Sequence, residues 1–73
     1  MTEREDWIAA YAAKLGVEPP SAEQFNDILE IAAAAAHGSE KTAAPIACWL
    51  AGTTGRPLRE LLRAAEEIEE AKR

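Results

Sequence analysis

The stretch Ala32-Ala33-Ala34-Ala35-Ala36-His37-Gly38 decides the fold of this chain. Five consecutive alanines favour a helix, and they give it a wall with almost no side-chain bulk, so another helix can approach closely. We expect that neighbour to be the helix predicted after residue 42. Gly38 can take the left-handed conformation that ends a helix, so we expect the alanine helix to stop there. The stretch predicts a compact helical domain and indicates no chemistry.

Two capping boxes predict helix starts before the alanine run. Thr2 with Glu5, and Ser21 with Gln24, each place a hydroxyl residue three positions before an acidic or amide residue. The first helix is therefore expected over about residues 3–15, followed by Gly16 and a proline-containing connection. The second helix is expected to begin at Ser21.

Two further helices are predicted after the alanine run. Thr42 is expected to cap the third helix and to place Pro45 in its first turn, where proline costs no backbone donor. Residues 52–55, Gly-Thr-Thr-Gly, are expected to form a loop. The fourth helix is expected to open near Pro57 and to run to about Lys72. Short connections favour helices that pack roughly antiparallel. We thus predict an all-α fold, a compact small bundle of four helices in one domain.

Each predicted helix carries apolar residues at helical spacing, and these stripes are the expected core. Charged residues off the stripes, including Asp27 and the glutamates of the fourth helix, are expected to be solvated. The stripes are Trp7, Ile8, Tyr11 and Leu15; Phe25, Ile28, Leu29 and Ala32; Ile46, Trp49 and Leu50; and Leu58, Leu61, Leu62, Ala65 and Ile68.

The aromatic side chains fall on these stripes, so core packing is their expected role. Two tryptophans are nevertheless hard to bury completely in a chain of 73 residues. We therefore expect an exposed apolar patch near Trp7 or Trp49 that receives a protein partner or a second copy of the chain.

Composition excludes several classes of function. A chain of 73 residues buries only about 60% of its unfolded surface, so a partner subunit would add stability. The net charge of −5 argues against binding nucleic acid or anionic membrane. The single cysteine, Cys48, allows no internal disulfide and fits a reducing cytosol. No signal peptide and no stretch of about 20 apolar residues is present, so we expect a cytoplasmic protein.

Few residues offer catalytic or metal-binding chemistry. One histidine and one cysteine are too few for a structural zinc site. A Cys48/His37 dyad is the one conceivable nucleophilic pair. Cys48 lies beside Trp49, where cysteine usually acts as a small hydrophobe, and His37 suits a structural role at a helix C-terminus. We expect no catalytic residues, no metal and no cofactor, and therefore no enzyme.

An anion site is the alternative reading of one segment. Gly52-Thr53-Thr54-Gly55 leads into a predicted helix N-terminus, where free amides attract anions, and arginines follow it. The candidate ligand-binding residues are Thr53, Thr54, Gly55, Arg56 and Arg59, with Arg63 two turns into the helix. An ordinary surface turn is the competing interpretation. If the site exists, phosphate or GTP should raise the melting temperature, and Arg56→Ala and Arg59→Ala should remove that gain without changing the unliganded stability.

Several short motifs occur in one order along the chain: Trp7 and then Leu15-Gly16, Ile28-Leu29-Glu30-Ile31-Ala32, Ala36-His37-Gly38, Ala43-Ala44-Pro45-Ile46 and Leu50-Ala51-Gly52. In this order they resemble a small bacterial domain of unknown function. That domain occurs alone or appended to molybdenum cofactor guanylyltransferase, the enzyme that joins a guanine nucleotide to molybdopterin. Two positions depart from the pattern: Lys41-Thr42 stands where Arg-Pro is commoner, and Cys48-Trp49 replaces a smaller polar residue and phenylalanine.

The resemblance implies no catalytic residues and an association with molybdenum cofactor biosynthesis, as an accessory or docking module. Together with the residues, it predicts a non-catalytic helical interaction domain that binds partners near Trp7 and Trp49. The expected partner is a protein, such as a nucleotidyltransferase of that pathway, or a second copy. A small anion- or nucleotide-binding domain is the alternative.

Overall fold

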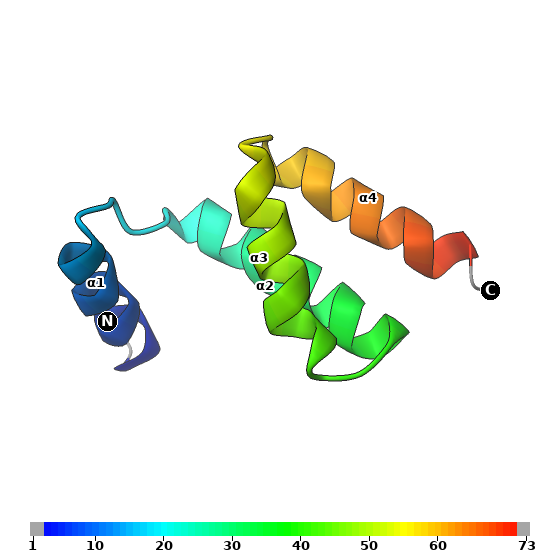
Figure 1. The fold of residues 1–73 in the computed structure, drawn as a ribbon, viewed down its shortest axis with the longest axis horizontal. Helices are drawn as coiled ribbons and strands as arrows, with labels where there is room; N and C mark the ends of the chain where they lie inside the picture. The colour runs from blue at the N-terminus through cyan, green and yellow to red at the C-terminus, as the bar shows by residue number, and fades with distance from the viewer. Residues whose placement is uncertain (1–2, 72–73) are drawn as a thin grey trace.

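Four helices make up the part of the fold that the structure describes. The computed structural model describes residues 3–71, apart from the side chain of Glu69. Within that range it has no strands, and its helices are α1 (Glu3–Leu15), α2 (Ala22–Gly38), α3 (Ala43–Thr54) and α4 (Leu58–Ala71) (Figure 1). The predicted all-α fold is confirmed. The predicted capping box at Thr2 and the predicted end of the last helix at Lys72 lie outside the described residues.

Local hydrogen bonds explain where α1 ends and α2 begins. Gly16 has φ +73°, its N–H donates to the Ala13 carbonyl at 3.2 Å, and the Val17 N–H donates to the Ala12 carbonyl at 3.0 Å. This is the Schellman pattern, which a glycine permits because it has no Cβ. The predicted capping box of Ser21 and Gln24 is confirmed, with reciprocal hydrogen bonds of 2.9 and 3.1 Å.

Helix α2 ends at Gly38, as predicted, but not through the predicted conformation of that glycine. Gly38 is the last helical residue, and among the described residues only Gly16 and Gly55 have positive φ, so the expected left-handed Gly38 is wrong. Ser39 instead leaves the helix with φ −147°, and its N–H donates to the Ala35 carbonyl at 3.0 Å. Because this bond already satisfies a carbonyl of the last turn, the helix ends without a left-handed residue.

Helix α3 is longer than predicted. Residues 52–54, which were expected in a loop, are helical, and Gly55 with φ +68° ends the helix. The hydroxyls of Thr53 and Thr54 donate to the Leu50 and Ala51 carbonyls at 2.6 and 2.9 Å, which stabilises this last turn. Glycine disfavours a helix interior by only about 1 kcal/mol, so Gly52 does not stop the helix. Thr42 is the N-cap residue, but its side chain makes no capping hydrogen bond.

Helix α2 is the centre of the bundle, because both α3 and α4 pack on it. Figure 1 shows α3 returning along α2 and α4 turning back again from the end of α3, while α1 lies at the opposite end of the molecule. Helix α1 meets the start of α2, where the Arg4 guanidinium lies 4.9 Å from the centre of the Phe25 ring. The molecule is elongated as a result, with extents of 40, 23 and 18 Å.

Few side chains are buried among the described residues. The buried hydrophobic residues are Ala12, Ile31 and Leu62, and Asp27 is buried with them at 5% exposure. The expected solvation of Asp27 is therefore wrong. Asp27 precedes Ile31 by one helical turn, so it shares the face of α2 that meets α4, where Arg59 pairs with it.

Most of the predicted core stripes are only partly buried. Of the fourth helix, Leu62 is buried and Leu58, Leu61 and Ala65 are half-buried, and Glu66, Glu67 and Glu70 are exposed as predicted. Phe25, Ile28 and four of the five alanines of the run are half-buried, whereas Ala33 is exposed. The inward placement is wrong for a larger set that is exposed: Trp7, Tyr11, Leu15, Leu29, Ile46, Trp49, Leu50 and Ile68.

Candidate interaction surface

An apolar groove lies between the C-terminal half of α2, α3 and α4. Its volume is about 490 Å³, and Ile31 and small residues of the three helices form most of its walls. Ile46 and Leu50 of α3 and Ile68 of α4 also line it, and all three remain more than half exposed. The remaining lining residues are Ala34, Ala35, Gly38, Ser39, Glu40, Thr42, Ala43, Ala47 and Ala65. The groove is therefore open to solvent along these apolar side chains.

Helix α3 turns its small residues toward α2 and its large ones toward solvent. Ala44, Ala47, Cys48 and Ala51 are half-buried, and the Cys48 Sγ lies 4.0 Å from the Ile28 carbonyl oxygen of α2. Ile46, Trp49 and Leu50, which we name the α3 ridge, are exposed, with Trp49 at 69%. Their i, i+3, i+4 spacing places them on one side of the helix, beside the groove.

Helix α1 carries a second exposed apolar stripe. Trp7, Tyr11 and Leu15, which we name the α1 ridge, follow one another at intervals of four residues, and all three are more than half exposed. The rings of Trp7 and Tyr11 pack against each other with centroids 5.3 Å apart. The ridge is a preformed aromatic surface on α1, the helix that lies at the end of the molecule away from the C-terminal half of α2 (Figure 1).

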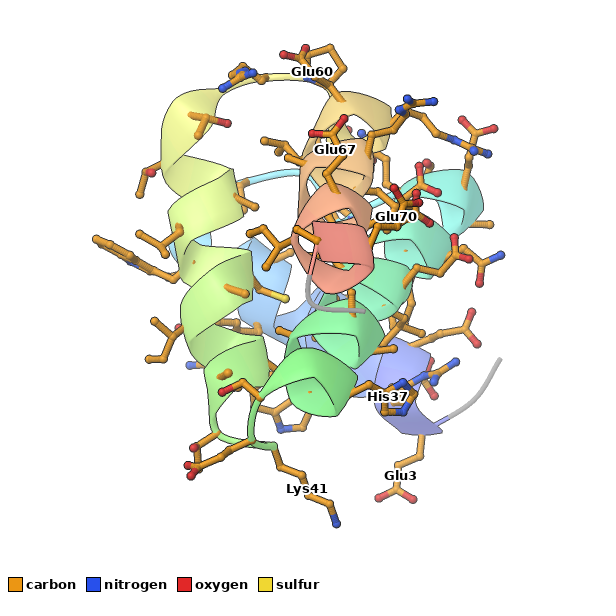
Figure 2. All side chains as sticks on the ribbon, turned by 90° about the vertical axis from the view of Figure 1, so that its right-hand side faces the viewer. Glu3, His37, Lys41, Glu60, Glu67 and Glu70 are labelled. Atoms are coloured by element: carbon orange, nitrogen blue, oxygen red, sulfur yellow. The ribbon has the colours of Figure 1, made fainter. Side chains whose placement is uncertain are left out.

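Charge is separated from the α3 ridge. No charged residue occurs from Thr42 to Gly55, whereas α4 carries exposed carboxylates at Glu66, Glu67 and Glu70. Figure 2 shows Glu70 on the side of α4 away from α3. The α3 ridge is thus an uncharged face on a chain whose net charge is −5.

The residues of the predicted anion site bond within the chain. The Thr53 and Thr54 hydroxyls donate to carbonyls of α3, and the Arg56 N–H donates to the Thr54 hydroxyl at 3.1 Å. The Arg56 guanidinium pairs with Glu60, with Nε 2.9 Å from the carboxylate, and Arg59 Nε lies 3.5 Å from Asp27 Oδ2. Gly55 ends α3 rather than opening an extended loop. Anion binding by these five residues stays a prediction.

We expect Arg59→Ala to destabilise the unliganded chain, contrary to the sequence-based expectation. The substitution leaves the buried Asp27 carboxylate without the cation that lies 3.5 Å from it, and removing one partner of a fully buried ion pair costs about 3–5 kcal/mol. The Arg59 side chain is 75% exposed, so solvent screening reduces the expected loss in the free energy of unfolding to about 1 kcal/mol. Urea denaturation would measure the loss. Arg63→Ala, one turn further along α4 and without an ion pair among the described residues, is the control, and an equal effect of both substitutions would contradict the role of the pair.

The comparison with protein families now bears on this geometry. The family described as a domain of unknown function (DUF6457) matches residues 1–73. The chain belongs to the DUF6457 family. The predicted resemblance to a small domain of unknown function is confirmed to that extent. No curated protein matches the chain. No solved structure matches it either.

The DUF6457 domain does not assemble the Cys48/His37 pair. The Cys48 thiol lies against Ile28 of α2. His37 follows Ile28 by nine residues, so the two residues are about 13 Å apart along the helix axis. His37 is exposed at the end of that helix (Figure 2). Burial raises the pKa of the Cys48 thiol, which lowers the fraction of the nucleophilic thiolate. Among the described residues no cluster of three or more His, Cys, Asp and Glu side chains could hold a metal ion.

No helix within residues 3–71 of the DUF6457 domain combines the length and the apolar character that crossing a bilayer requires.

Sequence reasoning singled out Trp7 and Trp49 but missed the groove of the DUF6457 domain. Ile68 was assigned to the core, and Ala43 and Ala47 were not considered as a surface. One signal could have found this face: the absence of charge from Thr42 to Gly55 gives α3 no polar side to turn toward solvent.

Proposed function

We propose that this DUF6457 domain is a non-catalytic interaction domain that binds other protein surfaces through its α3 and α1 ridges. The observation that carries the proposal is that α3 has no charged residue and yet none of its residues is buried. A helix without a polar face normally lies inside a protein. Large exposed apolar patches mark interaction sites, and the groove beside α3 offers a concave surface next to such a patch.

The small core supports the same proposal. The described residues bury only three hydrophobic side chains, whereas nine large ones are exposed. A partner that covers some of the exposed residues adds to the free energy of unfolding, because it binds the folded state and not the unfolded chain. Association would thus supply the burial that a chain of 73 residues achieves poorly by itself.

The absence of catalysis is part of the proposal. Cys48 is the strongest nucleophile type in the chain, and its raised pKa and its contact with Ile28 oppose nucleophilic attack. Exposed carboxylates such as Glu66 and Glu67 lie on a solvated face of α4, where a proton donor or acceptor has no enclosed substrate site.

Molybdenum cofactor guanylyltransferase is the proposed protein partner, in the bacterial cytoplasm. The support is the resemblance of the ordered motifs from Trp7 to Gly52, since the similar domain also occurs appended to that enzyme. The α1 ridge is the proposed contact, because aromatic residues are enriched at interfaces. Helix α1 also lies at one end of the molecule (Figure 1) and contributes no residue to the groove, so a partner on α1 leaves that face open.

Calorimetric titration of the purified chain with a purified molybdenum cofactor guanylyltransferase tests this assignment. We expect binding that Trp7→Ala weakens by about 30-fold, the effect of a hot-spot residue worth about 2 kcal/mol. Trp49→Ala, which removes an equally exposed tryptophan from the other ridge, is the matched control and should leave the affinity unchanged. Failure of the unmutated chain to bind would contradict the pathway assignment.

A further inference from the structure

We infer that the α3 ridge is self-complementary, and that two copies of the chain pair through it, each ridge lying against the groove of the other copy. The inference rests on the proposed function and names the partner of the α3 ridge. In a two-fold arrangement the same patch serves both copies, so one surface is sufficient.

Charge favours a second copy at this face. Two chains of net charge −5 repel each other unless they meet where charge is absent. Residues 42–55 are such a place, and the α4 carboxylate of Glu70 lies on the side of that helix away from α3 (Figure 2). A basic partner would be attracted to the acidic face of α4 rather than to the uncharged ridge.

The shape of the face also fits a second α3. Ile46, Trp49 and Leu50 continue to Thr53 at i, i+3, i+4 and i+7, the spacing with which one helix packs along another. The groove walls beside the ridge are mostly small, and the exposed Ile46 and Ile68 line the groove from α3 and α4. A bulky Trp49 from a second copy therefore meets a hollow of about 490 Å³ whose lining is mainly apolar, with Glu40 as the charged residue of that lining.

The available area suits a stable pair. A standard interface buries about 800 Å² of solvent-accessible surface on each partner. That is about one-seventh of the 5812 Å² of accessible surface of this chain. Seven of the 12 residues of α3 are exposed, and the groove beside them extends the face onto α2 and α4. A small apolar ligand fits less well, because such ligands are about 70–90% covered in their sites, and Ile46, Leu50 and Ile68 leave this groove open.

Sedimentation equilibrium of the full chain over the micromolar range tests the pairing. We expect a dimer, and we expect Trp49→Glu to make the chain monomeric with its helical circular dichroism retained, because an unpaired carboxylate resists burial between two copies. Trp7→Glu is the matched control, since Trp7 is 63% exposed on the α1 ridge, and it should remain dimeric. If Trp49→Glu does not fold, isotope-filtered NMR of the unmutated dimer should still show contacts between the Trp49 indole and the Ile68 methyl groups of different copies.

The sedimentation results that would contradict the pairing are as follows. A monomer at every concentration overturns it, and so does a dimer that Trp7→Glu dissociates and Trp49→Glu does not. If a monomeric chain binds the guanylyltransferase, the self-pairing fails while the proposed interaction function stands. If the monomeric chain binds neither a second copy nor that enzyme, both fail.

Discussion

Ile31→Ala is expected to remove a large part of the chain's stability. Ile31 is 4% exposed, and it lies on α2, the helix on which both α3 and α4 pack. Truncating such a side chain to alanine costs about 2–5 kcal/mol. A domain of 73 residues has a free energy of unfolding of about 4–11 kcal/mol, so about half of it would be lost. Urea denaturation followed by circular dichroism, at one fixed protein concentration, measures the change.

Leu29→Ala is the matched control for Ile31→Ala, because it changes a leucine of the same helix that is exposed. We expect its effect to stay within about 0.5 kcal/mol, as for ordinary surface substitutions. Equal losses for the two substitutions would contradict the assignment of Ile31 to the core of the bundle.

Leu62→Ala is the second substitution with a large expected effect. Leu62 is the buried hydrophobic residue of α4, and α4 is held to the molecule by its contact with α2. The expected loss is again about 2–5 kcal/mol. In a domain of this size that corresponds to a fall in melting temperature of at least about 8 °C. Thermal unfolding by circular dichroism or calorimetry records it.

Ile68→Ala separates the two roles of α4. Ile68 is 64% exposed at the mouth of the groove, six residues after Leu62. We expect Ile68→Ala to leave the melting temperature of the monomeric Trp49→Glu background unchanged. A fall as large as that of Leu62→Ala in this background would mean that Ile68 belongs to the core of the single chain.

These expectations share one physical cause. Helix α2 makes the contacts that join α3 and α4, and the described part of the chain buries few large side chains. Each buried side chain therefore contributes a larger share of the free energy of unfolding than it would in a domain of ordinary size. The many exposed apolar residues contribute little until another surface covers them.

The sequence by itself determined the helices and several of their ends. Ser21 and Gln24 specify the start of α2, and Gly16 specifies the end of α1, because these signals act within a few residues. Gly52 shows the limit of this local reasoning: its pattern predicts a loop, yet the residue is helical, and the Thr53 and Thr54 hydroxyls donate to carbonyls of the same turn.

Only the tertiary structure decided which apolar stripes are covered. Periodicity places Trp49 beside Ile46 and Trp7 beside Tyr11, but it does not say whether another part of the same chain covers them. Asp27 is the converse case, a charged residue that became buried because α4 brings Arg59 to it. The groove exists only where three helices meet, so no single segment of the sequence contains it. The chain's own residues specify its helices, whereas burial depends on the arrangement of several helices in space.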